Sequence, residues 1–327
     1  MTGNDATPRG VAVLGFWHVH ADDYARLAAE HPGTRVVAAW DPDAERGREG
    51  ASRLGVEFVA DLGELLARPA VEGVTVTTAT DEHPTVIRAA LEAGKHVFTE
   101  KLLAGATAEA EALVTLAASV ERSLVVSLPR LAEPLAVTVR RLVRAGALGE
   151  LTYARVRMAH DGWIAGWLPE RFGDPSAALG GALADLGCHP VYLVQDLLGA
   201  RPDVVRAAYT RVTDHAVEDN AVVTMAYPGG AIGVAEASFV TTPGAFALEV
   251  RGTAGSLLYG FGREALLGKG GALGADWTEV PLDPAEASPF DTWVAAMPTG
   301  APTPANSAAA IELTRLVERA ASAATLA

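Results

Sequence analysis

The sequence has little of what several classes of protein require. Its single cysteine, Cys188, cannot form an internal disulfide, which predicts a reducing, cytoplasmic setting. Lys and Arg number 26 against 40 Asp and Glu, a formal net charge of −14, so the general attraction to nucleic acids and anionic membranes is missing. Charged residues interrupt every apolar run before the roughly 18 residues that span a bilayer. Residues 1–10 lack the basic start and apolar stretch of a signal peptide. We therefore expect a soluble protein without nucleic-acid or membrane partners.

A length of 327 residues predicts about two domains. In the first part of the chain, short apolar runs alternate with segments of helical period, a pattern typical of βαβ units and a parallel sheet. We therefore predict an N-terminal Rossmann domain, a doubly wound parallel sheet, over residues 1–128. Its six predicted strands are VAVLG (11–15), RVVAAW (35–40), VEFV (56–59), VEGVTVTT (71–78), KHVFTE (95–100) and SLVVSL (123–128).

After a further helix, the pattern changes near the turn at 145–150 to long strands of period two with glycine turns. This pattern predicts an α+β domain over residues 129–327, built on a large, open, mostly antiparallel sheet. A helical insertion over about 182–198 interrupts the strands, and residues 306–326 have the spacing of a closing helix. A sheet face that no predicted helix covers favours a homo-oligomer, a dimer or tetramer formed through that face.

The first predicted strand ends in the turn Gly15-Phe16-Trp17-His18-Val19-His20. Only the first glycine of a dinucleotide-binding G-x-G-x-x-G turn is present. The alternative is that this segment is a strand-to-helix turn that binds no ligand. Asp41 ends the second strand, where a carboxylate accepts hydrogen bonds from the adenosine ribose and repels a 2′-phosphate. This favours NAD over NADP, although Asp41 is also in place to cap the next helix.

His18 and His20 suggest a metal site, since neutral imidazoles are common ligands. At the start of a helix, residues two apart diverge by about 200°. We therefore expect no metal and place His18 in the lining of the cofactor or substrate cleft. A metal-dependent hydrolase or lyase that uses His18, His20 and His189 is the weaker alternative.

Two further clusters carry chemistry. Glu100 and Lys101 follow the fifth strand, at the edge where open parallel sheets bind ligands, although lysines are common in solvated loops. Asp185 and His189 are four apart on an apolar helix, so they share one face. A carboxylate beside an imidazole orients it and raises its basicity, which suits proton transfer at neutral pH. A helical ion pair is the alternative, but its burial without a function would be costly.

Together these segments resemble the Gfo/Idh/MocA family of NAD(P)-dependent oxidoreductases, which join a Rossmann domain to a domain with a large open sheet. The resemblance extends over nearly the whole chain. It is carried by VAVLG (11–15), WDPDAERG (40–47), ATDEH (79–83), EAGKHVFTEK (92–101), AGALGEL (145–151), GGALADLGCH (180–189), EDNAVV (218–223) and VRGTAGSL (250–257).

The resemblance implies that a hydride passes between a secondary alcohol carbon and the nicotinamide. Lys101 would hydrogen-bond the reacting oxygen, His189 would be the general base and Asp185 would orient it. The expected cofactor-binding residues are Gly15, Trp17, His18, Val19, Asp41, Thr78, Thr80, His83, Glu100 and Lys101. The chain departs from the family at Leu102, where a proline is usual, at Trp17, which replaces a glycine, and at Tyr192, where an acidic residue is common.

Trp163, Trp167 and Arg171 precede the Asp185 and His189 segment. Aromatic faces beside a guanidinium suit sugar or cyclitol rings, and packing in the core or against another subunit is the equal alternative. With Lys101, Asp185 and His189 they form the predicted substrate site. We expect an NAD-dependent dehydrogenase acting on a sugar, cyclitol or related polyol. A non-catalytic NAD-sensing or scaffold protein on the same fold is the alternative.

Overall fold

A computed structural model describes residues 7–199 and 201–326. The predicted lack of a signal peptide concerns residues 1–10, of which 1–6 lie outside the described residues. The chain divides into two compact units. The first unit comprises the chain through Ser127 together with Ser288–Ile311, and the second comprises Leu128–Ala287 and Glu312–Ala327. This division differs from the predicted domains because residues 288–311 pack with the first unit.

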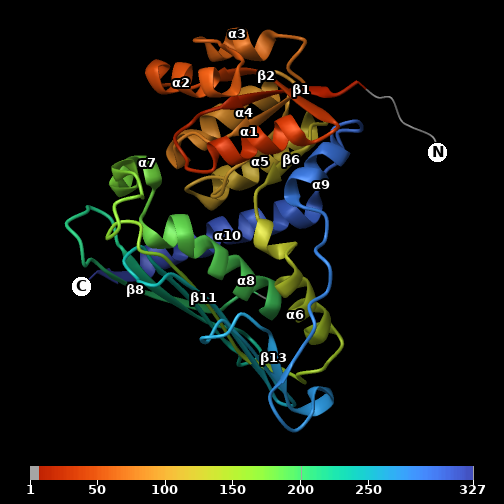
Figure 1. Ribbon diagram of the computed structural model, residues 1–327, viewed down its shortest axis with the longest axis vertical. Coiled ribbons are helices and arrows are strands. Elements are labelled where there is room, and N and C mark those ends of the chain that lie inside the picture. The colour runs from red at the N-terminus through yellow and green to blue at the C-terminus, as the bar shows by residue number, and fades with distance from the viewer. Residues whose placement is uncertain (1–6, 200, 327) are drawn as a thin grey trace. The chain divides into compact units, whose positions relative to one another are not determined.

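A parallel sheet forms the centre of the first unit (Figure 1). Within residues 7–127 it has six strands in the order β3-β2-β1-β4-β5-β6, the doubly wound order that reverses between β1 and β4. All six predicted strands are confirmed. They are β1 (Arg9–Leu14), β2 (Thr34–Trp40), β3 (Glu57–Phe58), β4 (Gly73–Val76), β5 (His96–Thr99) and β6 (Leu124–Val126).

Helices follow the strands of this sheet, and local signals fix several of their ends. The Asp43 side chain accepts hydrogen bonds from the N–H groups of Glu45 and Arg46 and so caps α2, which ends at the left-handed Gly55. The helices of this unit are α1 (Ala21–Glu30), α2 (Ala44–Leu54), α3 (Leu62–Ala67), η1 (Thr80–Glu82), α4 (His83–Glu92), α5 (Thr107–Ser119) and α9 (Pro289–Ala296).

Aromatic packing explains why α9 belongs to the first unit. Phe290 and Trp293 of α9 are buried in one core cluster with Tyr24 of α1 and Phe98 of β5. The rings of Phe98 and Phe290 meet edge to face, with centroids 5.2 Å apart, a favoured arrangement. Contacts between residues so far apart in the chain leave no local pattern, so the sequence did not predict them.

The second unit contains a mixed sheet in the order β14-β13-β12-β11-β7-β10-β9-β8-β15. The β7–β10 and β8–β15 pairs are parallel and the other pairs antiparallel, which confirms the predicted large, mostly antiparallel sheet. Strands β13, β14 and β15 were not predicted. The strands are β7 (Leu151–Ala159), β8 (Val204–Thr210), β9 (Asn220–Ala226), β10 (Ile232–Ser238), β11 (Ala245–Gly252), β12 (Ser256–Tyr259), β13 (Leu267–Lys269), β14 (Thr278–Glu279) and β15 (Ala324–Leu326).

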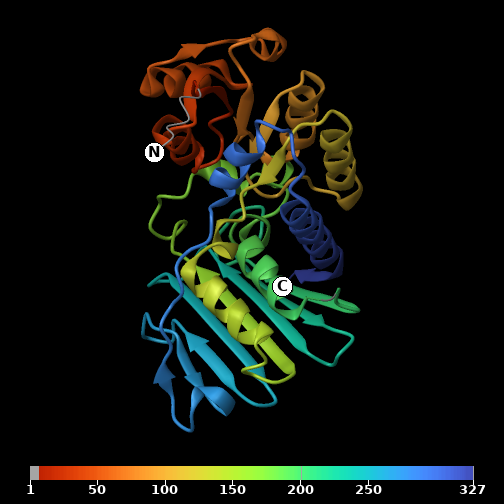
Figure 2. The same ribbon diagram turned by 90° about the vertical axis from the view of Figure 1, so that its right-hand side faces the viewer.

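Helices α6 (Pro134–Arg144) and α8 (Cys188–Leu198) lie against one face of this sheet (Figures 1 and 2). The opposite face carries alternating side chains that are exposed or half-buried, as in β9. The predicted closing helix is α10 (Pro304–Ala323). Short helical turns complete the chain: η2 (Pro129–Leu131), η3 (Glu170–Gly173), α7 (Pro175–Ala178), η4 (Leu183–Gly187) and η5 (Gly271–Leu273).

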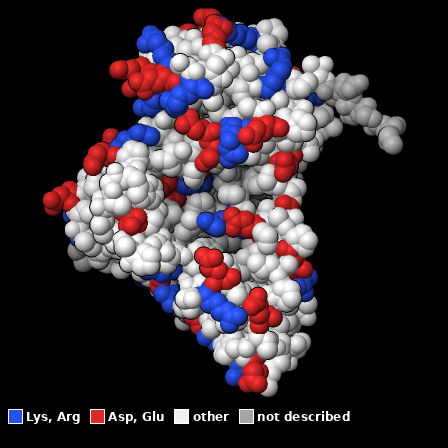
Figure 3. All heavy atoms as spheres, in the orientation of Figure 1, with Lys and Arg blue, Asp and Glu red and all other residues white. Residues whose placement is uncertain are grey.

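One helical stretch, Pro175–Leu198, is long and apolar enough to be a candidate for crossing a membrane. However, 78% of its apolar window is buried inside the protein, as in a core helix. On the face shown in Figure 3, basic and acidic side chains stand next to one another. The ion pairs of the protein include those of Arg53 with Asp22 and of Arg68 with Glu57.

Candidate functional site

The turn after β1 packs closely against the segment after β4. Gly15 has φ +90°, and a Cβ at this position would lie 2.5 Å from the backbone nitrogen of Thr78, so only glycine fits. The Thr77 hydroxyl donates to the Gly15 carbonyl at 2.6 Å, and the His18 N–H donates to the Thr77 carbonyl at 3.0 Å. The one glycine of the dinucleotide motif that this chain has therefore allows the turn after β1 to pack against Thr78 at the carboxyl edge of the sheet.

The other members of the turn differ in exposure. Trp17 and His18 are buried, whereas Val19 is 41% exposed. Because the Trp17 indole is buried, the residue that replaces the second glycine of the motif is part of the protein interior. Val19 is the member of this turn that solvent reaches most.

Asp41 follows β2, and every acceptor position of its carboxylate is used. One oxygen accepts from the Phe16 N–H at 2.6 Å and from Arg46 Nε at 2.9 Å. The other accepts from the Asp43 N–H at 2.8 Å and from Arg46 Nη2 at 2.7 Å. A ribose hydroxyl that binds Asp41 must therefore displace or share the Arg46 guanidinium. The alternative role, capping the next helix, falls to Asp43.

Glu100 is a buried carboxylate surrounded by positive and polar groups. His20 Nδ1 lies 3.2 Å and His18 Nδ1 3.9 Å from its Oε2, which also accepts from the Tyr24 hydroxyl. Lys101 Nζ lies 3.7 Å from Oε1. Burial would raise the pKa of Glu100, but the charges of His18 and Lys101 and a hydrogen bond from His20 hold it well below its usual range. The buried Lys101 ammonium thus lies beside an ionised carboxylate.

The expected divergence of His18 and His20 is wrong. Their ring centroids lie 4.6 Å apart, and with Glu100 they offer ligand atoms within 4.8 Å of one another. The physical reason is that His20 precedes α1 with non-helical backbone angles, so the separation of 200° does not apply. The carboxylate between the rings already has the Lys101 ammonium beside it, and the absence of a metal stays a prediction.

Buried polar atoms around the same edge test whether a dinucleotide fits. His83 Nδ1 lies 2.7 Å from the Leu102 carbonyl, and burial lowers the pKa of His83 to about 4, so the neutral ring donates through Nδ1. Its Nε2 and the Thr78 hydroxyl have no hydrogen-bond partner among the described residues. Such buried groups need a partner. Together with Gly15 and Asp41, they fit a polar ligand such as a nicotinamide dinucleotide. Thr80 is buried beside them in η1, and the Lys101–Leu102 peptide bond is cis.

In the second unit, the predicted regular helix over 182–198 begins with a π-helical turn, η4, before α8. Asp185 lies in η4 and His189 in α8. The rule that residues four apart share one face of a regular α-helix therefore does not apply to this pair. Glu218 holds the start of this segment by accepting from the N–H groups of Gly181 and Leu183, both at 3.0 Å. These two hydrogen bonds fix the position at which the helical segment begins.

His189 is buried, and its Nδ1 lies 2.8 Å from the Tyr192 hydroxyl. Tyr192 also accepts from the Arg130 N–H at 3.3 Å, and burial raises the pKa of Tyr192 well above its usual value, so the hydroxyl stays neutral. When Nδ1–H donates to this hydroxyl, Nε2 is the acceptor that a base requires. Asp185 is half-buried, and its charge opposes the lowering of the His160 pKa by burial.

The predicted aromatic substrate residues differ in their surroundings. One face of Trp163 is stacked on His215, with centroids 3.8 Å apart. Trp167 is 52% exposed, and its indole N–H donates to Asp161 at 3.2 Å. Arg171 is half-buried with its guanidinium over Phe172. Only Trp167 therefore presents a largely open aromatic surface.

Three residues that matter in this geometry were missed or underrated from the sequence. Tyr24 hydrogen-bonds Glu100, Tyr192 contacts His189, and Glu218 anchors the segment before Asp185. Tyr192 was visible as a departure from the family, and Glu218 lies within the EDNAVV motif. Tyr24 had no signal beyond its place on the apolar side of α1.

A doubly wound sheet with a glycine turn after β1 and a carboxylate after β2 is typical of a dinucleotide-binding domain. Residues 9–128 match the model of the oxidoreductase family with an NAD-binding Rossmann fold, and residues 136–258 match the GFO/IDH/MocA C-terminal domain. The chain belongs to the Gfo/Idh/MocA family of oxidoreductases.

Relatives support this assignment. The chain is 27% identical to a scyllo-inositol 2-dehydrogenase (NAD(+)) of Bacillus subtilis, covering 77% of this chain and 72% of that protein. It is 30% identical to a 1,5-anhydro-D-fructose reductase of Ensifer adhaerens, covering 77% of each. A crystal structure of an inositol dehydrogenase homolog complexed with NAD+ from Azotobacter vinelandii is 26% identical, with a TM-score of 0.81 over 97% of this chain and 95% of that one.

Proposed function

We propose that this protein transfers a hydride between NAD and a secondary alcohol of a sugar, cyclitol or related polyol. The observation that carries the proposal is the buried Lys101 ammonium beside the ionised Glu100 at the carboxyl end of β5. Burying an ammonium is costly unless it is paired or used, and this edge is where doubly wound sheets bind ligands. The inositol dehydrogenase and sugar reductase among the relatives support the substrate class.

We assign the cofactor to the carboxyl edge of the first unit. The turn at Gly15, Trp17, His18 and Val19 would lie against the pyrophosphate, and Asp41 would take the ribose hydroxyls. The nicotinamide end would meet Thr78, Thr80, His83, Glu100 and Lys101. When bound, NAD supplies the hydride acceptor for oxidation. The orphan Thr78 hydroxyl and His83 Nε2 support this assignment because a dinucleotide carries donors and acceptors for both.

Lys101 and His189 have different roles at the alcohol oxygen. A hydride cannot leave a carbinol carbon unless the O–H proton leaves as well, so His189 Nε2 takes that proton as general base. The Lys101 ammonium donates to the same oxygen and stabilises its developing negative charge. Asp185 and Tyr192 orient His189, while Trp163, Trp167 and Arg171 hold the sugar or cyclitol ring. We also propose a cytoplasmic homo-oligomer that associates through the open face of the second sheet.

The test is a turnover assay in which NAD and a panel of inositols and sugars are supplied and the absorbance of reduced nicotinamide is followed. The proposal expects at least one polyol to give steady reduction of NAD. If tryptophan fluorescence and thermal melting also show no response to NAD or NADH at millimolar concentration, the proposal fails.

A further inference from the structure

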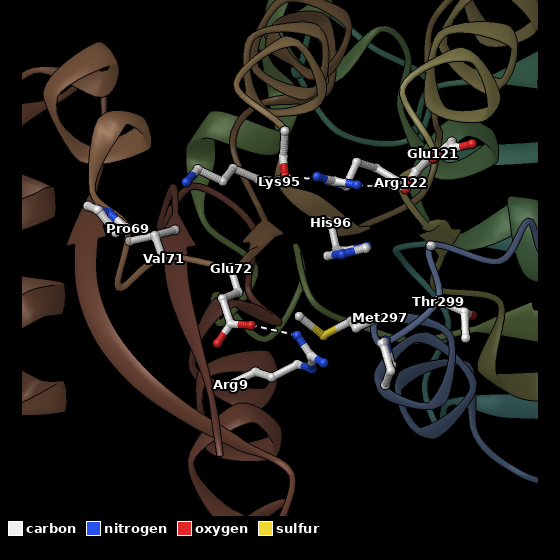
Figure 4. A pocket seen from close by; sticks show the side chains of 13 residues that line it. Arg9, Pro69, Val71, Glu72, Lys95, His96, Glu121, Arg122, Met297 and Thr299 are labelled. Atoms are coloured by element: carbon white, nitrogen blue, oxygen red, sulfur yellow. Dashed lines mark hydrogen bonds and ion pairs between the residues drawn. The ribbon is translucent and has the colours of Figure 1, made fainter. Parts of the chain in front are cut away.

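A pocket lies at the amino ends of the strands of the first unit, the opposite edge of the sheet from Asp41 and Lys101. Arg9 begins β1, Glu72 precedes β4, and Lys95 and His96 stand at the start of β5. The cavity measures about 400 Å³, a volume within the range of small-molecule sites. In Figure 4 the His96 ring lies between Arg122 above it and the Arg9–Glu72 pair below it.

Three basic side chains, Arg9, Lys95 and Arg122, and two acidic ones, Glu72 and the exposed Glu121, line this pocket, so positive charge exceeds negative charge by one. Arg9 and Glu72 form an ion pair at 2.5 Å and neutralise one another. Lys95 and Arg122 form no ion pair with any carboxylate among the described residues. Lys95 Nζ donates to the Arg68 carbonyl at 3.2 Å, and Arg122 donates through Nε to Gly94 and through Nη1 to Glu121, both carbonyl oxygens. Each side chain therefore keeps further N–H donors available.

Burial is the largest cause of the lowered pKa values of Lys95 and His96, and nearby positive charges add to it. Burial and then the charge of Arg122 lower the pKa of Lys95. Burial and the charges of Arg122 and Arg9 lower the pKa of His96 to about 4. Nδ1 of the neutral His96 ring accepts from the Ser123 N–H at 3.1 Å, which leaves its proton on Nε2 as a further donor. The positive excess in this pocket is opposite in sign to the net charge of −14 of the whole chain.

The wall of the pocket is held in place by tight backbone contacts. Gly300 has φ +64°, and a Cβ there would lie 2.1 Å from the Glu121 carbonyl. This contact fixes the segment after α9 against the turn that carries Arg122. The donors are thus held in position before a ligand arrives, which reduces the entropy cost of binding.

We propose that this pocket binds the phosphate group of a small phosphate monoester. A phosphate dianion matches the two unpaired cations, Lys95 and Arg122, and charge-assisted hydrogen bonds to its oxygens are the strong kind. The cavity is larger than a phosphate ion requires, so it leaves room for the organic part of an ester. The proposal is independent of the hydride-transfer function, because none of its residues belongs to the carboxyl edge.

The experiment is calorimetric titration of the full chain with β-glycerophosphate, inorganic phosphate and glycerol, with ionic strength held constant by sodium chloride. We expect β-glycerophosphate to bind more tightly than inorganic phosphate, and glycerol not to bind. Arg122→Gln should weaken binding about tenfold or more, the scale of one charge-assisted hydrogen bond. Arg88→Gln removes the same charge from an exposed position of α4 outside the pocket and should leave binding unchanged.

Two results would overturn the proposal. One is equal affinity in Arg122→Gln and Arg88→Gln, which would reduce the effect to net charge. The other is binding of the ester no tighter than that of inorganic phosphate, or no binding of either below about 10 mM. If Arg122→Gln fails to fold, the His96 imidazole resonances of the wild type decide, because a bound phosphate must shift them and an ion bound elsewhere must not.

Discussion

The two units hold their candidate residues in different ways. In the first unit, Asp41, Glu100 and Lys101 stand directly after parallel strands, and backbone N–H groups or neighbouring side chains fill their hydrogen-bonding positions. In the second unit, Asp185 and His189 lie on one irregular helical segment, and a neutral tyrosine contacts the imidazole. The difference is consistent with the proposed roles, in which the first unit binds the dinucleotide and His189 of the second takes the proton. Substitutions should therefore separate cofactor affinity from turnover.

The largest expected effect is on proton transfer from the substrate. His189→Ala should lower kcat about a thousandfold, because it removes the proposed general base. The dissociation constant for NAD, measured by calorimetry, should stay within about twofold of the wild type. His31→Gln, which changes a half-buried histidine away from both clusters, is the control. Loss of NAD binding in His189→Ala would contradict the division between the units.

The second-largest effect is expected for Lys101→Met. We expect kcat/KM to fall about a hundredfold, because the variant lacks the ammonium proposed to stabilise the developing alkoxide. The exposed Lys269→Met in β13 is the matched control. Since Lys101 also lies beside Glu100, circular dichroism and thermal melting must show that the variant is folded. A folded variant with normal kcat/KM would remove Lys101 from the mechanism.

Asp41→Ala probes cofactor choice within the first unit. The substitution removes the carboxylate that repels a 2′-phosphate and frees the Arg46 guanidinium, so the preference for NAD over NADP should fall about tenfold. The double variant Asp41→Ala with Arg46→Ala should lose the improvement for NADP. The ratio of kcat/KM for the two cofactors is the measurement, and an unchanged ratio in Asp41→Ala would argue against the ribose assignment.

Acid should destabilise the protein through His83. Its pKa is about 4 when folded, below the ordinary value of 6.5, so between these values only the unfolded chain takes up the proton. The contribution of His83 to stability is therefore full above about pH 6.5 and is lost toward pH 4, by at most about 1.4 kcal/mol for each pH unit. His96, whose pKa is also lowered to about 4, adds a loss of the same sign. Urea unfolding at about pH 6.5 and about pH 5.5 measures the slope. His83→Gln should reduce this loss of stability by about 1 kcal/mol over that pH interval.

Tyr192→Phe should have the smallest effect. Without the hydroxyl the His189 ring loses one orienting hydrogen bond, so kcat should fall about threefold with little change in KM. Tyr259→Phe, in the edge region of the second sheet, provides a control for loss of a hydroxyl. A thousandfold loss would instead make Tyr192 part of the proton path.

Local patterns carried most of the fold prediction. Apolar runs bounded by turns predicted all six strands around Gly15, Asp41 and Lys101, because each buried parallel strand is a short continuous run. Contacts between distant parts of the chain were not predictable in the same way. The placement of Phe290 and Trp293 beside Phe98 depends on tertiary packing alone, and the two- and three-residue strands β13 to β15 are too short to show a period.

The candidate site was predictable in residue type but not in geometry. Glu100 and Lys101 were expected at the edge of the sheet, and they lie there. The short distance between the rings of His18 and His20 was not predicted. His20 precedes the helix, so the rotation of about 100° per helical residue does not hold there. The contact of Tyr192 with His189 was not predictable, because the spacing of Asp185 and His189 does not reveal the π-helical turn between them.

The most direct test of the account is a double-mutant cycle between Lys101 and His189, measured as kcat/KM for oxidation of a polyol by NAD. If both side chains act on one alcohol oxygen, the effects of Lys101→Met and His189→Ala are strongly non-additive, and the double variant is little worse than His189→Ala. Losses that simply multiply would mean that the two residues act independently, and would contradict their convergence on one substrate.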